Sequence, residues 1–165
     1  MDNADFYIKK LNLTPHPEGG HFKEVYRSDE SLKAGLPNRY KGERSFSTSI
    51  YFLLKGKQKS LLHKLKSDEI WHFYEGSAVK LYAIDAKAKL YTKLLGRNID
   101  AGECMQLVIK RGYWFCAEIS DENSFSLFGC TVAPGFDFSD FKLGKREKLI
   151  RLYPEHEKLI KKFTR

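Results

Sequence analysis

Short aromatic and β-branched runs, separated by turn residues, are the feature of this sequence that most restricts its fold. They begin at Ser45 and end at Ala133. Many short strands at close spacing are typical of an all-β sandwich or barrel, and such barrels often enclose a ligand. We therefore predict an all-β fold. The runs are SFSTSIYFLL, SLLHKLK, EIWHFYE, AVKLYAID, KLYTKLL, MQLVIK, YWFCAEI and SFSLFGCTVA.

The two ends of the chain have a different pattern. Apolar spacing over 5–13 predicts a short N-terminal helix, and a strand is expected at 21–27. The polar segment 28–44 carries Gly and Pro and reads as a mobile loop. At the other end, 145–151 and 154–163 are expected to form two short helices, with Pro at the first position of the second.

Length and composition set the class of protein. The chain has 165 residues with 42% hydrophobic content, which suits one domain, 1–165, with a core of its own. It contains no apolar run of membrane-spanning length, and its first residues lack a signal-peptide core. We expect a soluble cytoplasmic protein with no membrane partner. Cys104, Cys116 and Cys130 are interpreted as buried small hydrophobes, because an odd count without close pairs argues against disulfides or zinc.

The formal net charge of +8 raises the question of nucleic-acid binding. The basic residues are scattered, and no helix-turn-helix, zinc-finger or base-stacking motif accompanies them. A solvated lysine-rich surface accounts for this charge, and we predict no nucleic-acid partner.

Two stretches resemble the two conserved motifs of the cupins. The first is HKLKSDEIWHFYEG (63–76) and the second is GECMQLVIKRGYWF (102–115). Positions that match the motifs are His63, Glu69, Gly76 and Gly112, and positions that depart from them are Leu65, Lys110 and Phe115. The departures at Leu65 and Phe115 fall where metal-binding histidines normally stand.

Further segments resemble one branch of small single-domain cupins whose function is largely unassigned. They are HPEGG (16–20), STSIYFLL (47–54), DEIWHF (68–73), YWF (113–115) and VAPGFDFSDF (132–141). The resemblance implies a cupin jelly-roll β-barrel, or double-stranded β-helix, with short N- and C-terminal helices. It also implies a homodimer, to which the strand at 21–27 is expected to contribute, and a pocket lined from both motifs.

A divalent metal site is one hypothesis for that pocket. Catalytic metal sites usually need about three protein ligands, and two cupin ligands remain, His63 and Glu69. His72 is the obvious third, but its odd separation from Glu69 places the two on opposite faces of a regular strand. Gln106 offers a weaker oxygen ligand. The alternative is that His63 and Glu69 hydrogen-bond to each other without a metal.

Acid–base chemistry without a metal is another hypothesis. His63 can exchange a proton near neutral pH, Glu69 can orient it, and Tyr51 is a candidate opposing acid. Metal-free sugar-nucleotide epimerases of the cupin superfamily use a histidine and a tyrosine in this way. The analogy favours an epimerase or isomerase acting on a sugar or other polar metabolite.

Ligand-binding candidates lie on several segments. Arg27 can clamp a phosphate or carboxylate, or simply pair with Glu24 at the surface. Glu18 can contact ligand, while Gly19-Gly20 beside it can serve a tight turn. Trp71, Phe73, Trp114 and Phe115 form either an aromatic wall for the ligand or part of the core. The segment VAPGFDFSDF is expected to be structural.

Three functions therefore stay open for the pocket. They are a metal-independent epimerase or isomerase, a metal-dependent cupin enzyme such as an oxygenase, and a non-enzymatic module for binding or storing a small molecule.

Overall fold

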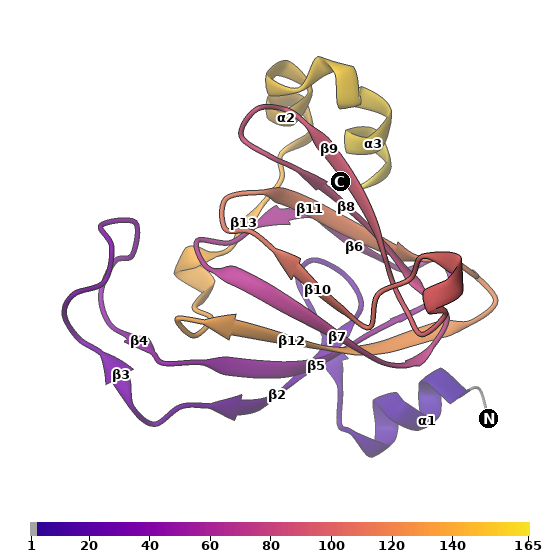
Figure 1. Cartoon of the computed structure of the whole chain (residues 1–165), viewed down its shortest axis with the longest axis horizontal. Coiled ribbons are helices and arrows are strands. Elements are labelled where there is room, and N and C mark those ends of the chain that lie inside the picture. The colour runs from indigo at the N-terminus through magenta and orange to yellow at the C-terminus, as the bar shows by residue number, and fades with distance from the viewer. Residues whose placement is uncertain (1–2) are drawn as a thin grey trace.

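The computed structural model describes residues 3–165 and contains two large antiparallel sheets packed face to face, with a separate two-stranded sheet of β3 and β4 (Figure 1). The strands are β1 (Thr14–Pro15), β2 (His21–Arg27), β3 (Ser31–Leu32), β4 (Arg44–Ser45), β5 (Thr48–Lys55), β6 (Lys59–Lys64), β7 (Asp68–Gly76), β8 (Val79–Ile84), β9 (Leu90–Leu95), β10 (Gln106–Ile109), β11 (Trp114–Ile119), β12 (Phe125–Ala133) and β13 (Lys142–Leu143). The helices are α1 (Asn3–Lys10), α2 (Arg146–Leu152) and α3 (Glu157–Lys162), with 3₁₀ turns at Ile99–Ala101, Phe138–Asp140 and Pro154–His156.

The strand order identifies a jelly roll. One sheet has six strands in the order β1-β2-β5-β12-β7-β10, and the other has five in the order β13-β6-β11-β8-β9. Consecutive strands alternate between the sheets in the β5 to β8 region, so the chain winds around a common interior. The all-β cupin jelly roll expected from the sequence is confirmed.

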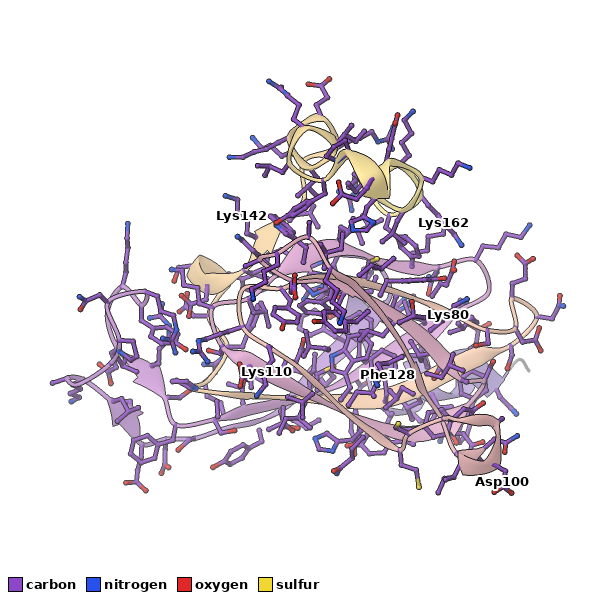
Figure 2. All side chains as sticks on the ribbon, turned by 45° about the horizontal axis from the view of Figure 1, so that its top comes forward. Lys80, Asp100, Lys110, Phe128, Lys142 and Lys162 are labelled. Atoms are coloured by element: carbon purple, nitrogen blue, oxygen red, sulfur yellow. The ribbon has the colours of Figure 1, made fainter. Side chains whose placement is uncertain are left out.

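Alternating side chains from both sheets fill this interior. Phe52, Trp71 and Phe128 come from the six-stranded sheet, and Leu81 and Phe115 from the five-stranded sheet. Phe128 lies between the two layers (Figure 2). Trp71 and Phe128 pack with ring centroids 4.7 Å apart and ring planes tilted by 34°, and each is almost completely buried. Burial of such aromatic side chains is the main favourable contribution to folding.

The helices cover the outer faces of the two sheets. Helix α1 packs over Leu53 and Leu127 of the six-stranded sheet, and α2 and α3 pack over Leu62, Trp114 and Cys116 of the five-stranded sheet (Figure 1). None of the helices in the described part of the chain is long and apolar enough to cross a membrane.

The runs predicted as strands all form strands, and the terminal helices form within a few residues of their predicted bounds. Two expectations need correction. Segment 28–44, expected as a mobile loop, contains strand β3 and the first residue of β4, which pair with each other. It is also anchored, because buried Arg44 donates two hydrogen bonds to Asp140 at 2.7 and 2.8 Å. Cys104 is exposed, whereas Cys116 and Cys130 are buried as expected.

The turn between β1 and β2 binds the edge of one sheet to the other. The Leu61 amide of β6 donates to the Glu18 carbonyl at 2.8 Å, so this turn of the six-stranded sheet touches the five-stranded sheet. Gly19 has φ +107°, and a Cβ there would collide with the Lys59 carbonyl oxygen. The glycine is required both by its backbone conformation and by this close approach.

We predict that Gly19→Ala lowers the free energy of unfolding by at least about 3 kcal/mol, since left-handed strain and backbone collision add together. Gly35→Ala is the matched control, because Gly35 has φ +79° with open space around it, and it should cost about 1–2 kcal/mol from strain alone. Urea unfolding of both variants measures the difference, and equal losses would contradict the contact argument.

Candidate functional site

A cavity of about 220 Å³ opens between the sheets beside the β1–β2 turn. Apolar side chains such as Ile50, Phe52, Trp71 and Val132 make much of its wall. The polar groups that line it are His16, Glu18, Glu24, Arg27, Thr48, His63, Glu69, Cys130 and Asp137. An apolar cavity with a few convergent polar groups is the usual form of a ligand site.

Glu18 lies at the centre of the polar groups. Its Oε1 accepts a hydrogen bond from Ser60 Oγ at 2.7 Å, and its Oε2 lies 3.1 Å from His63 Nε2. Ser60 and His63 are three residues apart on β6 and would face opposite sides of a regular strand. A register shift opposite Phe115–Ala117 brings both to the cavity side, where both meet Glu18.

The partners of His63 determine where its proton lies. His63 Nδ1 is 2.6 Å from the Leu61 carbonyl oxygen, which can only accept, so Nδ1 carries the proton. Burial lowers the pKa of His63 to about 3, and burial raises the pKa of Glu18 well above its ordinary value. The pair is therefore neutral, with the Glu18 carboxyl donating to His63 Nε2.

His16 completes this end of the cavity. Its Nδ1 accepts the Glu18 backbone N–H at 3.3 Å, which leaves its other ring nitrogen as the donor in the neutral form. Burial lowers the pKa of His16 to about 4. The group formed by His16, Glu18 and His63 thus carries no net charge at neutral pH.

Glu69 is a second protonation centre and comes from β7 of the six-stranded sheet, which faces the sheet of His63. Burial raises its pKa from 4.5 to about 7, although the Trp71 indole and the Cys130 thiol partly oppose this rise. Within residues 3–165, Glu69 Oε2 has no hydrogen-bond partner of normal geometry. A buried carboxyl oxygen without a partner costs free energy unless a ligand or solvent satisfies it.

Arg27 and Glu24 form an ion pair at the cavity mouth. The Arg27 guanidinium donates from Nε to Glu24 Oε1 at 3.0 Å and from Nη2 to Glu24 Oε2 at 2.7 Å. It also donates to the Phe136 carbonyl at 3.0 Å and to Ser45 at 3.3 Å. The surface ion pair expected for Arg27 is present, and Arg27 also lines the cavity, while its role as a ligand clamp stays a prediction.

Four predicted site residues lie elsewhere. Tyr51 is on the outer face of β5 and packs beside Tyr74 with ring centroids 5.9 Å apart. His72 and Gln106 bond to each other on the outer face of the six-stranded sheet at 3.0 Å, and His72 also bonds Thr131. Trp114 faces outward toward α2 and α3, so the aromatic wall lacks it.

The metal site expected from His63, Glu69 and His72 is not assembled. His72 is on the far side of β7, as strand alternation implies, and both nitrogens of His63 have protein partners. Phe115 occupies the position opposite His63 on β11, with ring centroids 4.0 Å apart. The described residues contain no group of three or more His, Cys, Asp or Glu side chains suited to a metal ion. The donor set does not fit a cupin metal.

Two further expectations change. His63 and Glu69 do not hydrogen-bond to each other, because the carboxyl partner of His63 is Glu18. The segment VAPGFDFSDF is more than structural, since Phe136, Asp137 and Phe138 line the cavity. Sequence reasoning missed His16, Ser60 and Cys130. The HPEGG segment, in which His16 and Glu18 are two residues apart, was the available signal for the first.

Comparison with known proteins supports the family. A sequence profile described as Cupin superfamily (DUF985) matches residues 5–144, so the chain belongs to this family. The uncharacterized protein YML079W of Saccharomyces cerevisiae is 29% identical over 152 residues, which cover 85% of this chain and 74% of the yeast protein.

Solved structures agree with this assignment. Protein SO0799 from Shewanella oneidensis has a TM-score of 0.89 at 39% identity, covering 100% of this chain and 99% of that one. A hypothetical protein from Leishmania major has a TM-score of 0.88 at 34% identity, covering 98% of each chain. Oxalate decarboxylase from Bacillus subtilis, at 13% identity and a TM-score of 0.56, covers 90% of this chain and 36% of its own and shows the shared fold alone.

We predict that Glu69→Gln stabilises the protein at pH 8 relative to the unchanged chain but has little effect at pH 5. The folded state holds the Glu69 proton up to about pH 7, whereas the unfolded state loses it near 4.5. The protonated Glu69 side chain therefore makes its full contribution to the free energy of unfolding below pH 4.5. That contribution is lost as the pH rises through 7. Glutamine removes that loss, which is on the order of 1–3 kcal/mol at pH 8.

Thermal unfolding at the two pH values measures this effect. Glu122→Gln, at an exposed side chain on a loop, is the matched control and should give the same small shift at both. A Glu69→Gln variant that is equally destabilised at pH 5 and pH 8 would show that the carboxyl is ionised and paired.

Proposed function

We propose that this cupin is a metal-independent enzyme of the epimerase or isomerase type, acting on a small sugar or other polar metabolite. The observation that carries the proposal is the pair of protonation centres on opposite sides of one cavity. Glu18, on the β1–β2 turn, is paired with His63 of the five-stranded sheet, and Glu69 comes from β7 of the six-stranded sheet.

The chemistry begins with removal of a proton from a carbon beside a carbonyl group. With a pKa of about 7, Glu69 is partly ionised at neutral pH and can accept that proton. Glu18 is protonated, and its proton can move from the hydrogen bond with His63 Nε2 to the carbonyl oxygen, so that a neutral enol forms. The negative charge thereby passes from Glu69 to Glu18, whose carboxylate accepts a hydrogen bond from Ser60 Oγ. Return of a proton to the same or the neighbouring carbon gives the epimer or the isomer.

The surroundings support such a reaction. Trp71, Ile50 and Val132 exclude water from the carboxyl groups, which strengthens electrostatic interactions in the cavity. Glu18 takes the role of opposing acid that the sequence suggested for Tyr51. His63, whose Nδ1–H donates to the Leu61 carbonyl, positions the Glu18 carboxyl through Nε2.

Cavity size limits the substrate. A volume of about 220 Å³ is smaller than the roughly 300–1,000 Å³ of pockets for drug-sized ligands. The cavity suits a molecule of monosaccharide size or smaller, and a nucleotide sugar would have to leave its nucleotide outside. Arg27 at the mouth can donate to hydroxyl or carboxylate groups of such a ligand.

We predict that the protein exchanges carbon-bound hydrogen of its substrate with D₂O, and that Glu69→Gln and Glu18→Gln each slow this exchange about 10²–10⁴-fold. Proton NMR of a panel of small aldoses, ketoses and hydroxy acids, each incubated with the protein in D₂O, measures the exchange for every compound. His72→Ala is the matched control, because His72 lies on the outer face, and it should exchange at the unchanged rate.

Other outcomes select the other functions. Exchange that is abolished by a chelator and restored by a metal ion would identify a metal-dependent enzyme. Ligand binding in the cavity without exchange of any carbon-bound hydrogen would identify a binding or storage module.

We also propose a homodimer formed through β2. Strand β1 pairs only with His21 and Phe22, and no other described strand pairs with the remaining outer edge of β2. Val25 and Tyr26 on this segment are 50% and 54% exposed. Unpaired edges are usually covered or paired, and a second copy of the chain can supply the partner.

We predict a dimeric mass by light scattering at micromolar concentration, and a shift toward monomer in Val25→Lys because a buried lysine disfavours the interface. Val108→Lys is the control, since Val108 is equally exposed, at 56%, on the edge strand at the other side of the sheet. A monomeric mass of the unchanged protein would refute the dimer.

A further inference from the structure

A second concave region lies behind the wall of the cavity and, unlike the cavity, is lined mainly by positively charged side chains. Leu65 and Phe141 line both the cavity and this groove, which has a volume of about 610 Å³. Five cationic side chains line it, and among its described lining residues Asp140 is the one acid. The five are Arg39, Lys64, Lys66, Arg111 and Lys142.

The carboxylates near the groove are already paired with cations. Asp140 is bound by Arg44 through two hydrogen bonds and by Lys66 Nζ at 3.1 Å. Although burial alone would raise it, Arg44 and Lys66 hold the pKa of Asp140 below its ordinary value. Asp68 pairs with Lys110 at 3.3 Å and lies 3.8 Å from the groove residue Arg111.

Lys64 and Lys142 are two cations of the groove without an acid partner among the described residues, and the Lys64 ammonium lies 4.9 Å from the centroid of the Trp114 ring. They face each other directly across the antiparallel pair of β6 and β13. Like charges directly opposite on neighbouring strands are destabilising, and no described acid pairs with either. Burial, Lys142 and Lys148 of α2 together lower the pKa of Lys64, which shows the crowding of positive charge. Figure 2 shows Lys142 beside β13, on the side of the fold that carries α2.

We infer that this groove binds a small multivalent phosphate anion such as a diphosphate group. Two lysines without an acid partner, with Arg111 and Arg39 at the sides, supply the converging donors that phosphate oxygens need. A bound anion would also relieve the repulsion between Lys64 and Lys142. This site is separate from the acid–base groups of the cavity and does not depend on them.

The shape of the groove favours a small anion over nucleic acid. Nucleic-acid surfaces extend along a row of phosphates and usually present aromatic rings for stacking. Here the cations converge from the β6 end, the β10–β11 turn and the β13 strand on one hollow, and Phe141 is the one aromatic side chain among its described lining residues.

Titration calorimetry of the full chain with sodium pyrophosphate at low ionic strength tests the site. We expect saturable binding at one site per chain that weakens as salt rises. Lys64→Gln combined with Lys142→Gln should weaken it about tenfold or more, as expected for losing charge-assisted hydrogen bonds. The matched control is Lys9→Gln with Lys10→Gln on α1, which makes the same change in net charge away from the groove.

Several outcomes decide the matter. Tighter binding of ADP than of pyrophosphate would support the site and identify a nucleoside diphosphate as its source, whereas equal binding would support an inorganic one. Equal affinity for citrate, preferential binding of a single-stranded oligonucleotide, or equal losses in the two double variants would overturn the inference.

Folding is checked without ligand by the single variant Lys142→Gln. Because Lys142 is exposed and faces Lys64, its neutralisation should raise the melting temperature while weakening pyrophosphate binding. A lowered melting temperature together with unchanged binding would show that Lys142 has a structural role, and would overturn the assignment.

Discussion

The contact between the β1–β2 turn and strand β6 is the constraint on which the site depends. Gly19 can approach the Lys59 carbonyl because it has no side chain, and the Leu61 amide then bonds the Glu18 carbonyl. This contact carries the Glu18 carboxyl from one sheet into the side of the other, between Ser60 and His63. The β1–β2 turn thus crosses the gap between the two sheets, which a regular strand of either sheet does not do. It thereby brings an acid–base group to the part of the cavity that carries His63.

Burial then sets the protonation of these groups. Two carboxyls and two imidazoles in this cavity favour their neutral forms, because burial removes the water that would stabilise their charged forms. Hydrogen bonds satisfy Glu18 and His63, whereas Glu69 Oε2 has no partner of normal hydrogen-bond geometry in the described part of the chain. Apolar side chains would fill this space at a lower free-energy cost, so the presence of polar groups here is an argument for function.

The sequence predicted the strands and the fold well, because turn residues and short aromatic runs are local signals. The prediction that Trp114 contacts the ligand was wrong, because its side chain packs under α2 and α3. Strand β11 is buried on both faces, with the cavity side on one and α2 and α3 on the other, so hydrophobicity does not alternate along it. The partnership of Glu18 with His63 was also out of reach, because it joins residues 45 positions apart through a bulged strand. Alternation did place His72 correctly on the outer face.

Strand β6 shows how one short segment separates two kinds of chemistry. His63 faces the cavity, where burial keeps it neutral, and Lys64 faces outward, where it stays beside the Trp114 ring with its nitrogen 4.9 Å from the ring centroid. Leu65 follows and forms part of the wall between the cavity and the groove. A shift of one residue in the register of β6 would place a lysine in the neutral cavity and a histidine among the cations. The pairing of β6 with β11 and β13, and its contact with the β1–β2 turn, thus hold the register that both regions require.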